Sequence, residues 1–276
     1  MQQASRDFPV LAGVDFTSRP RPAKPITLAL GRCVATGVVL DGLHRLADFD
    51  ALRDWLHTPG PWLGAFDFPF GLPRELVMDL GWPLSWPALI AHYAALPRER
   101  IRSTFAAFCA ARPPGAKFAH RACDRPARSS PSMKWVNPPV AFMLHAGAPL
   151  LLASGVHLPG LHEGDRNRVA LEAYPGLLAR ELIGARSYKS DTKARQDEPR
   201  RAARADLIAA LEQGRTRLAL RLVLSRAQRD SLIADASGDW LDAVLCMVQA
   251  AWSSAQPNFG LPEGVDPLEG WVATVG

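Results

Sequence analysis

The sequence predicts an α/β protein of one domain, residues 1–276, in which a mixed five-stranded sheet is covered by helices on both faces. Three observations predict this fold. Five short apolar runs resemble strands, one helical interval separates the third run from the fourth, and a group of helical segments follows the fifth. The composition, 48% hydrophobic and 21% charged, is that of an ordinary globular protein, and 276 residues are enough to bury a sizeable core.

Four strands and one helix are expected within the first 67 residues. A nearly continuous apolar run precedes a proline-rich turn, and two further β-runs are joined as a hairpin. Apolar residues at helical spacing then predict a helix. Because this helix connects the third strand to the fourth, we expect the fourth strand beside the first and parallel to it. The expected strands are 10–16, 26–35, 37–40 and 62–67, and the expected helix is 48–57.

Residues 70–165 are dense in Pro, Gly, Trp and Arg, and we expect them to form a large, mostly helical insertion with helices at 86–95 and 98–111. After the insertion the sequence predicts a fifth strand beside the fourth, and then helices that complete the cover of the sheet. The polar stretch 186–201 is expected to be mobile. The later elements are a strand at 168–174 and helices at 177–182, 199–213, 215–224 and 239–253.

Five acidic residues interrupt predicted elements that are otherwise mostly apolar. Asp15 and Asp67 end apolar strands, Glu172 lies within the fifth strand, and Asp239 and Asp242 open the last helix. A carboxylate in a buried strand is costly to desolvate unless its charge is compensated. Because the strands that end in Asp15 and Asp67 are expected to be neighbours, the sequence predicts one acidic cleft that holds Mg²⁺ or Mn²⁺.

Each acidic residue also has a structural interpretation. Asp15 and Asp67 could accept hydrogen bonds within the turns that follow their strands. Asp239 and Asp242 fit an N-cap and a partner for the helix dipole. Glu172 has the weakest explanation of this kind, because a sheet covered on both faces leaves its strand no polar side. One shared site accounts for all these positions more simply than separate local reasons.

Basic residues are unevenly spread along a chain of net charge +5, which permits an anionic partner without demanding one. Nine Lys or Arg stand against two acidic residues at 98–134, and eight against four at 180–204. These stretches are either solvated faces or surfaces that bind phosphate. The candidate phosphate contacts are Lys189, Lys193, Arg200 and Arg204, the last two of which share a helix face at i and i+4.

Several classes of protein find no support in the sequence. It contains no G-x-S-x-G and no G-x-G-x-x-G, so no motif predicts an esterase or a dinucleotide-binding enzyme. The four cysteines are scattered and are expected to be free thiols in a reducing compartment. No basic leader opens the chain, and no apolar segment reaches the roughly 20 residues of a membrane span. We therefore expect a cytoplasmic protein without a membrane partner.

The order of elements and acids resembles that of the ribonuclease H-like superfamily. Four short motifs carry a closer resemblance to a group of predicted nucleases known as domain of unknown function 429. They are Gly-Val-Asp-Phe at 13–16, Phe-Asp-Phe-Pro-Phe-Gly-Leu-Pro at 66–73, Glu-Ala-Tyr-Pro-Gly at 172–176 and Asp-Trp-Leu-Asp-Ala at 239–243. The last motif is also similar to the opening of the final helix in Holliday-junction resolvases, where both acids bind metal.

This resemblance implies that Asp15, Asp67, Asp239 and Asp242 are metal ligands. One departure matters, because most ribonuclease H-like nucleases have Glu where this chain has Asp67. The side chain is one methylene shorter, and Glu172 could supply the missing reach. The resemblance therefore gives Asp15, Asp67, Glu172 and Asp242 as the expected catalytic carboxylates.

Three functions follow from these observations. The leading hypothesis is a metal-dependent nuclease that hydrolyses phosphodiester bonds in DNA or RNA with Mg²⁺ or Mn²⁺. The second is a phosphotransferase or ATP-binding protein of the actin and sugar-kinase type, although only one copy of the fold is visible in the sequence. The third is a non-catalytic module that binds nucleic acid and retains its acids for structure.

Overall fold

The computed structural model describes residues 8–276, which form seven strands, ten α-helices and two 3₁₀ helices. The first seven residues, where no leader is expected, lie outside the described part of the chain. Within residues 8–276, no helix has both the length and the apolar character needed to cross a membrane.

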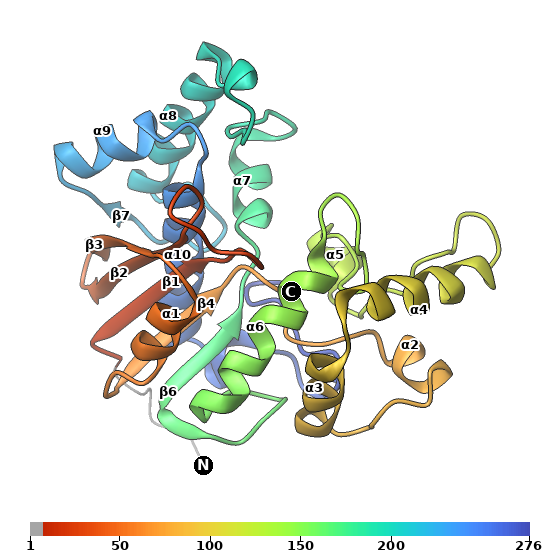
Figure 1. Cartoon of the computed structure of the whole chain (residues 1–276). Helices are drawn as coiled ribbons and strands as arrows, with labels where there is room; N and C mark the ends of the chain where they lie inside the picture. The colour runs from red at the N-terminus through yellow and green to blue at the C-terminus, as the bar shows by residue number, and fades with distance from the viewer. Residues whose placement is uncertain (1–7) are drawn as a thin grey trace.

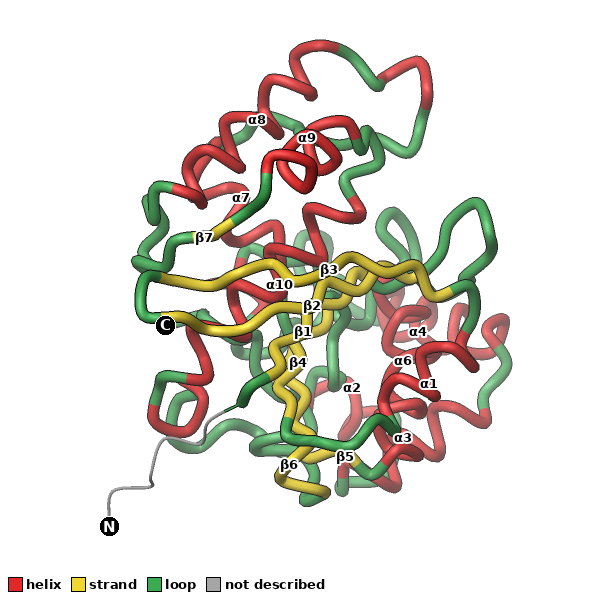
Figure 2. The backbone as a smooth tube through the Cα atoms, turned by 90° about the vertical axis from the view of Figure 1, so that its left-hand side faces the viewer, coloured by secondary structure: helices red, strands yellow, loops and turns green. Residues whose placement is uncertain are grey.

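A single mixed sheet forms the centre of the fold, with strand order β5-β6-β4-β1-β2-β3-β7 (Figures 1 and 2). The first three strands pair antiparallel in sequence, whereas β4 is parallel to β1 and β6 is parallel to β4. The strands are β1 (Val10–Asp15), β2 (Ile26–Val34), β3 (Gly37–Leu46), β4 (Trp62–Phe66), β5 (Val156–His157), β6 (Asp165–Glu172) and β7 (Leu222–Val223).

The predicted placement of the first, fourth and fifth strands is confirmed, but the predicted number of strands is wrong. Two short edge strands, β5 and β7, extend the sheet from five strands to seven. The third strand also continues to Leu46 rather than ending at residue 40. Its second half carries exposed polar side chains, including Asp41 and Arg45, so the apolar run stops before the hydrogen-bonded ladder does.

Helices cover both faces of the sheet (Figure 2). On one face, α1 and α6 share a core with the β1 side chains Ala12 and Val14. On the other face, α10 packs on β1, β2 and β4, with α7 and α8 beside it, in the core that contains Leu11. The α-helices are α1 (Phe49–Leu56), α2 (Arg74–Asp79), α3 (Trp86–Ala95), α4 (Arg98–Ala110), α5 (Asp124–Ala127), α6 (Val140–Ser154), α7 (Pro175–Ile183), α8 (Glu198–Glu212), α9 (Arg226–Ala234) and α10 (Asp239–Ser254); the 3₁₀ helices are η1 (Lys193–Arg195) and η2 (Pro257–Gly260).

The contact between β1 and α10 is unusually close because Gly13 faces the helix. A Cβ atom at position 13 would lie 2.0 Å from the carbonyl oxygen of Ala243 and 2.2 Å from the backbone nitrogen of Met247. No side chain larger than hydrogen fits there without a shift of the helix. The N-terminal turn of α10 is thereby held at the end of β1 that carries Asp15.

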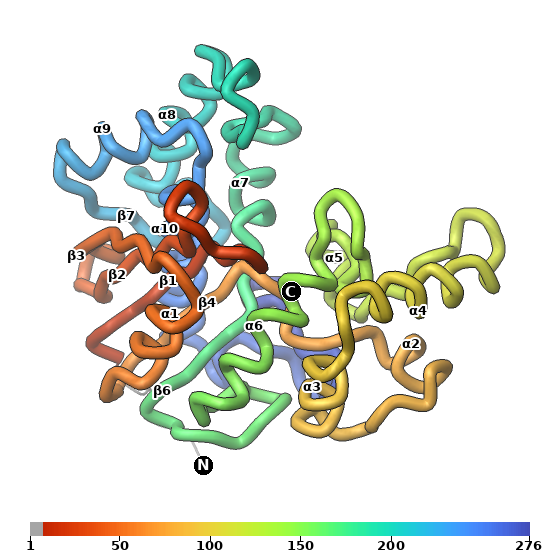
Figure 3. The backbone as a smooth tube through the Cα atoms, viewed as in Figure 1, coloured from red at the N-terminus to blue at the C-terminus, as the bar shows by residue number. Residues whose placement is uncertain are grey.

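Residues 70–165 hold five helices, α2 to α6, and most of them lie to one side of the sheet (Figure 3). The last of them, α6, differs from the others. It packs against α1, and its residues Leu144, Ala148 and Leu151 belong to the same core as the sheet. The end of this segment is therefore part of the layer that covers the sheet.

The prediction of a helix at 215–224 is wrong. This stretch is a turn that leads into β7, and Ala219 has a positive φ of 51° that no helix accommodates. Four α-helices, α2, α5, α6 and α9, were not predicted. Pro149 lies inside α6, and the helix is apolar on most sides, so it lacks the one-sided pattern by which a helix is recognised.

Candidate metal centre

Asp15 and Asp67 lie next to each other because their strands are parallel neighbours. Asp15 ends β1, Asp67 directly follows β4, and Val14 pairs with Phe66 in register. The backbone N–H of Asp67 donates to the carbonyl oxygen of Val14 at 2.9 Å, which fixes the position of the second acid beyond the end of its strand. The predicted side-by-side placement of these two acids is thus present.

Asp242 completes a group of three carboxylates. It lies in the first turn of α10, which the close contact at Gly13 holds against β1. One carboxylate oxygen from each of Asp15, Asp67 and Asp242 lies within 4.8 Å of the other two. We call these three residues the aspartate group; they come from β1, the end of β4 and α10.

The aspartate group carries more negative charge than its surroundings compensate. Within residues 8–276, the side chains of Asp15 and Asp67 accept no hydrogen bond, so the turn interpretation of these two residues is wrong. Burial, followed by repulsion from Asp242, raises the pKa of Asp15 well above its usual value and that of Asp67 to about 7. Asp15 and Asp67 thus lack a hydrogen-bond donor among residues 8–276, and their surroundings favour the protonated form.

Lys189 is the one cation in direct contact with the aspartate group among the described residues. Its Nζ forms an ion pair with one carboxylate oxygen of Asp242, and the hydroxyl of Tyr188 donates to the other at 2.5 Å. Burial lowers the pKa of Lys189, but Asp242 and the other acids outweigh this and raise it well above the usual value. Asp242 is therefore no simple helix-dipole partner, and the cap of α10 is Gly238.

Glu172 does not join the aspartate group, although it lies beside it on the next strand. Its carboxylate accepts two hydrogen bonds from the guanidinium of Arg121, at 2.6 and 2.7 Å, and one from the N–H of Phe70 at 2.9 Å. Arg121 also binds the buried Asp124. The predicted role of Glu172 as an additional metal ligand is not supported, because these donors already occupy its oxygens.

Asp239 also lies apart from the aspartate group. It is half-buried at the start of α10 and lines a separate hollow with Lys24 and Lys193. Burial raises its pKa, and the nearby ammonium of Lys24 acts in the opposite direction. The structure therefore brings together three of the four predicted metal ligands.

The sequence matches the family described as "Protein of unknown function (DUF429)" over residues 13–256, which includes the whole aspartate group. The chain belongs to the DUF429 family. No curated protein and no solved structure matches it significantly. The family resemblance seen in the sequence is thus confirmed, and the mixed sheet is consistent with a ribonuclease H-like placement of this DUF429 protein.

The four predicted phosphate contacts lie in different surroundings in this DUF429 protein. Lys189 contacts Asp242, and Lys193 is exposed in η1. Arg200 pairs with Asp197 at the start of α8. Arg204 was expected on the surface but is only 2% exposed, and its guanidinium donates to the carbonyl oxygens of Tyr188 and Ile233. Arg204 therefore holds the backbone beside Lys189 instead of facing a phosphate.

Sequence reasoning missed Tyr188 and Arg121. Arg121 was counted in a basic, solvated stretch, yet it is 3% exposed. Its partners Glu172 and Glu269 are 51 and 148 residues away along the chain, so no local pattern could reveal the pairing. Tyr188 precedes Lys189 in a polar stretch, and a single tyrosine among polar residues was the only sequence feature that could have indicated it.

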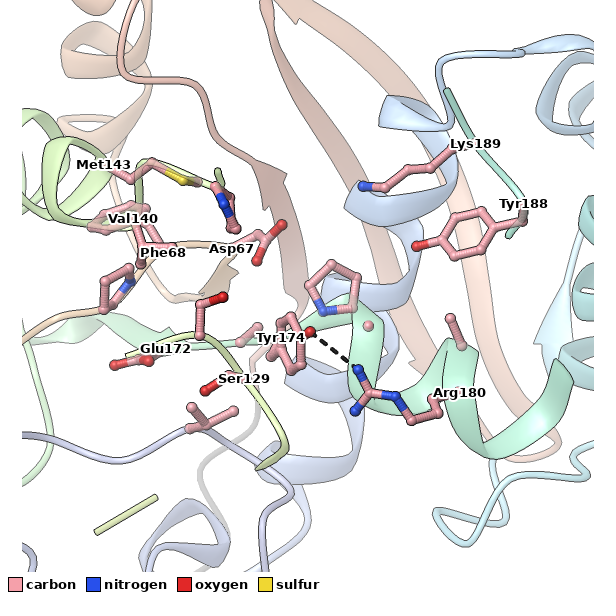
Figure 4. A pocket seen from close by; sticks show the side chains of 18 of the residues that line it. Asp67, Phe68, Ser129, Val140, Met143, Glu172, Tyr174, Arg180, Tyr188 and Lys189 are labelled. Atoms are coloured by element: carbon pink, nitrogen blue, oxygen red, sulfur yellow. Dashed lines mark hydrogen bonds between the residues drawn. The ribbon is translucent and has the colours of Figure 1, made fainter. Parts of the chain in front are cut away.

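A cavity of about 500 Å³ adjoins the aspartate group in this DUF429 protein (Figure 4). Asp67 and Lys189 are part of its wall. It lies between residues 129–143, which lead into α6, and residues 174–189, which include α7. Asp67 thus places the aspartate group at the edge of a half-open cavity of ligand size.

Proposed function

We propose that this protein is a metal-dependent nuclease that hydrolyses phosphodiester bonds. The observation that carries the proposal is the aspartate group, in which three carboxylates from three separate elements converge within 4.8 Å. Gathering three negative charges at the end of a sheet is costly for folding. A bound cation would remove this cost.

The donor set fits a hard divalent cation. Mg²⁺ and Mn²⁺ prefer carboxylate oxygens, and Mg²⁺ sites commonly use few carboxylates and keep the remaining positions for water and substrate phosphate. Asp15 and Asp67 have no competing hydrogen-bond donor among residues 8–276. Asp15, Asp67 and Asp242 are therefore the residues that would hold Mg²⁺ or Mn²⁺ in this protein.

A cation in this position activates water for attack and stabilises negative charge on a phosphate oxygen. The residues of the chain then have separate tasks. The carboxylates would hold the cation, and the close contact between β1 and α10 at Gly13 sets how near the backbones that carry Asp15 and Asp242 lie. The ammonium of Lys189, at the wall of the cavity, is placed to meet an anionic substrate.

Nucleic acid is the substrate class that agrees best with the charge of the molecule. The net charge is +5, and exposed basic residues such as Lys193 lie on the 186–201 stretch, which also carries Lys189, the partner of Asp242. Nothing in the aspartate group distinguishes DNA from RNA, so both belong in the experiment.

The test compares the wild type with Asp15→Asn, which removes a charge at nearly constant volume. Mn²⁺ affinity is measured by calorimetry on metal-stripped protein, and cleavage is measured on labelled DNA and RNA. We expect Asp15→Asn to weaken Mn²⁺ binding by more than about 100-fold, because losing a direct ligand exceeds the 10- to 100-fold effect of outer partners. Cleavage should disappear with it.

The matched control is Asp54→Asn, which removes an exposed carboxylate from α1 far from the aspartate group. It should bind Mn²⁺ and cleave like the wild type. In chelator, Asp15→Asn should unfold at the same or a higher temperature than the wild type, because the metal-free carboxylates repel one another. Equal cleavage by wild type and Asp15→Asn would contradict the proposal, and Mn²⁺ binding without cleavage would favour the phosphotransferase instead.

A further inference from the structure

The cavity beside the aspartate group has two chemically different walls. The wall formed by the segment before and within α6 is apolar, with Pro138, Val140 and Met143. The opposite wall, at the start of α7 and beyond, carries Tyr174 and Arg180 (Figure 4). A ligand that enters this space therefore meets apolar side chains on one side and an aromatic ring with a cation on the other.

Arg180 lacks an ion-pair partner within residues 8–276, unlike Lys189 and Arg121, which also line the cavity. Its guanidinium makes only long hydrogen bonds, at 3.4 Å to the carbonyl oxygen of Ala127, 3.5 Å to that of Arg128 and 3.5 Å to the hydroxyl of Tyr174. A half-buried cation held this loosely in a cavity wall is suited to an anionic or hydrogen-bonding ligand.

The volume limits what can enter. About 500 Å³ lies within the 300–1,000 Å³ of small-molecule pockets, which is enough for one base with its sugar and phosphate. A base-paired duplex exceeds this volume, because each base pair would bring a second base, sugar and phosphate into the same space. A nucleotide in a duplex would have to leave its stack to enter, at the cost of unpairing.

We propose that this cavity receives a single unpaired nucleotide, whose phosphate lies beside Asp67 and Lys189 and whose base lies between the apolar wall and Tyr174. The proposal rests on the proposed nuclease function and narrows its substrate to strand ends and single-stranded nucleic acid. Stacking on an aromatic ring tolerates every base, so recognition would depend little on sequence. Arg180 would contact the nucleotide from the side of α7.

The test fills the cavity without touching the aspartate group. Val140→Trp places a large ring in the apolar wall, and Val136→Trp is its matched control, because Val136 is 49% exposed and lies outside the cavity lining. Binding is measured by fluorescence anisotropy in Ca²⁺ with labelled oligothymidylate, either single-stranded or paired with oligoadenylate. Gel analysis shows whether the probe stays intact, and Mn²⁺ affinity is measured separately by calorimetry.

We expect the wild type to bind the single strand at least about tenfold more tightly than the duplex, and Val140→Trp to lose about tenfold in single-strand affinity. Val136→Trp should change it by less than about twofold, as surface substitutions do. All three proteins should bind Mn²⁺ equally well. Arg180→Gln, compared with Arg201→Gln on the exposed face of α8, repeats the test if Val140→Trp does not fold.

The outcomes separate the two proposals. Preference for the duplex, or unchanged single-strand binding in folded Val140→Trp and in Arg180→Gln, overturns the cavity proposal even if the protein cleaves with Mn²⁺. Single-strand binding that is lost in these variants, in a protein that neither binds Mn²⁺ nor cleaves, supports the cavity and overturns the nuclease.

Discussion

Two clusters of buried and half-buried acids lie side by side at the same edge of the sheet, and their charges are compensated in different ways. The aspartate group lies at the ends of β1 and β4 and on α10. The second cluster, which we call the Arg121 cluster, consists of Arg121, Asp124 and Glu172 at the end of β6. Glu172 and Phe66, the residue before Asp67, are paired in register, so the two clusters occupy neighbouring strand ends.

In the Arg121 cluster, side-chain and backbone groups of the protein compensate the charge of both carboxylates. The guanidinium of Arg121 binds both carboxylates. The backbone N–H of Phe70 also donates to Oε2 of Glu172, and that of Arg121 donates to Oδ2 of Asp124, both at 2.9 Å. In the aspartate group, only Asp242 has such partners among residues 8–276. The comparison shows that burial of acids does not by itself indicate a metal site. The aspartate group differs from the Arg121 cluster in that Asp15 and Asp67 have neither an ion pair nor a hydrogen-bond donor among residues 8–276.

The largest effect is expected when the internal cation of the Arg121 cluster is removed. Arg121→Met leaves Asp124 and Glu172 buried without their partner, which typically costs about 3–5 kcal/mol of unfolding free energy. Denaturant unfolding measures this loss, and added Mn²⁺ should not restore it. The control is Arg112→Met, which breaks a partly exposed pair with Glu75 and should cost less than about 1 kcal/mol. Equal losses in the two variants would abolish the distinction between the clusters.

A smaller effect of the opposite kind is expected at the aspartate group. Lys189→Met removes the ammonium that competes with a metal ion for Asp242, so Mn²⁺ affinity should rise about tenfold, or about 1.4 kcal/mol. Thermal unfolding in chelator should show a loss of stability that Mn²⁺ reverses. Lys193→Met, which changes an exposed lysine of η1, is the control for the general loss of positive charge. Weaker Mn²⁺ binding in Lys189→Met would show that the lysine organises the site.

The smallest effect is expected for Asp239→Asn, which tests the limit of the aspartate group. Asp239 raises the pKa of Asp15 only as the weakest of several influences and lines a different hollow. Its loss should weaken Mn²⁺ binding by about threefold, the size of a screened interaction between charges. The calorimetric comparison is with Asp242→Asn. If both variants lose binding to the same degree, Asp239 is a ligand and the group has four members.

The sequence was informative where local pattern and topology determine the outcome. The apolar runs that become β1 and β4, separated by one helix, were enough to place Asp15 and Asp67 together, because parallel neighbours end at the same edge. The pattern failed for α6, which is buried on several sides, and at 215–224, where Ala219 breaks the helix with a positive φ. A one-sided apolar pattern is absent from the first and misleading in the second.

The composition of the site was harder to predict, because it depends on contacts between distant segments. That Glu172 is bound and Asp67 is not follows from where Arg121 lies after folding, and Arg121 reaches Glu172 across 51 residues. Lys189 was singled out as basic, but its contact with Asp242 depends on the path of a polar stretch. Arg204 of α8 fixes that path, because its guanidinium donates to the backbone carbonyl of Tyr188. Residue type alone could not separate a ligand from a structural acid.

The glycine at position 13 has a consequence for the kind of ion that the protein can hold. Because the backbones of β1 and α10 touch there, the distance between the main chains that carry Asp15 and Asp242 is set by this contact. A site in which the backbones of two ligands are held at one distance favours ions of one radius. Discrimination between small and large divalent ions would then be decided at a residue that has no side chain and never touches the ion.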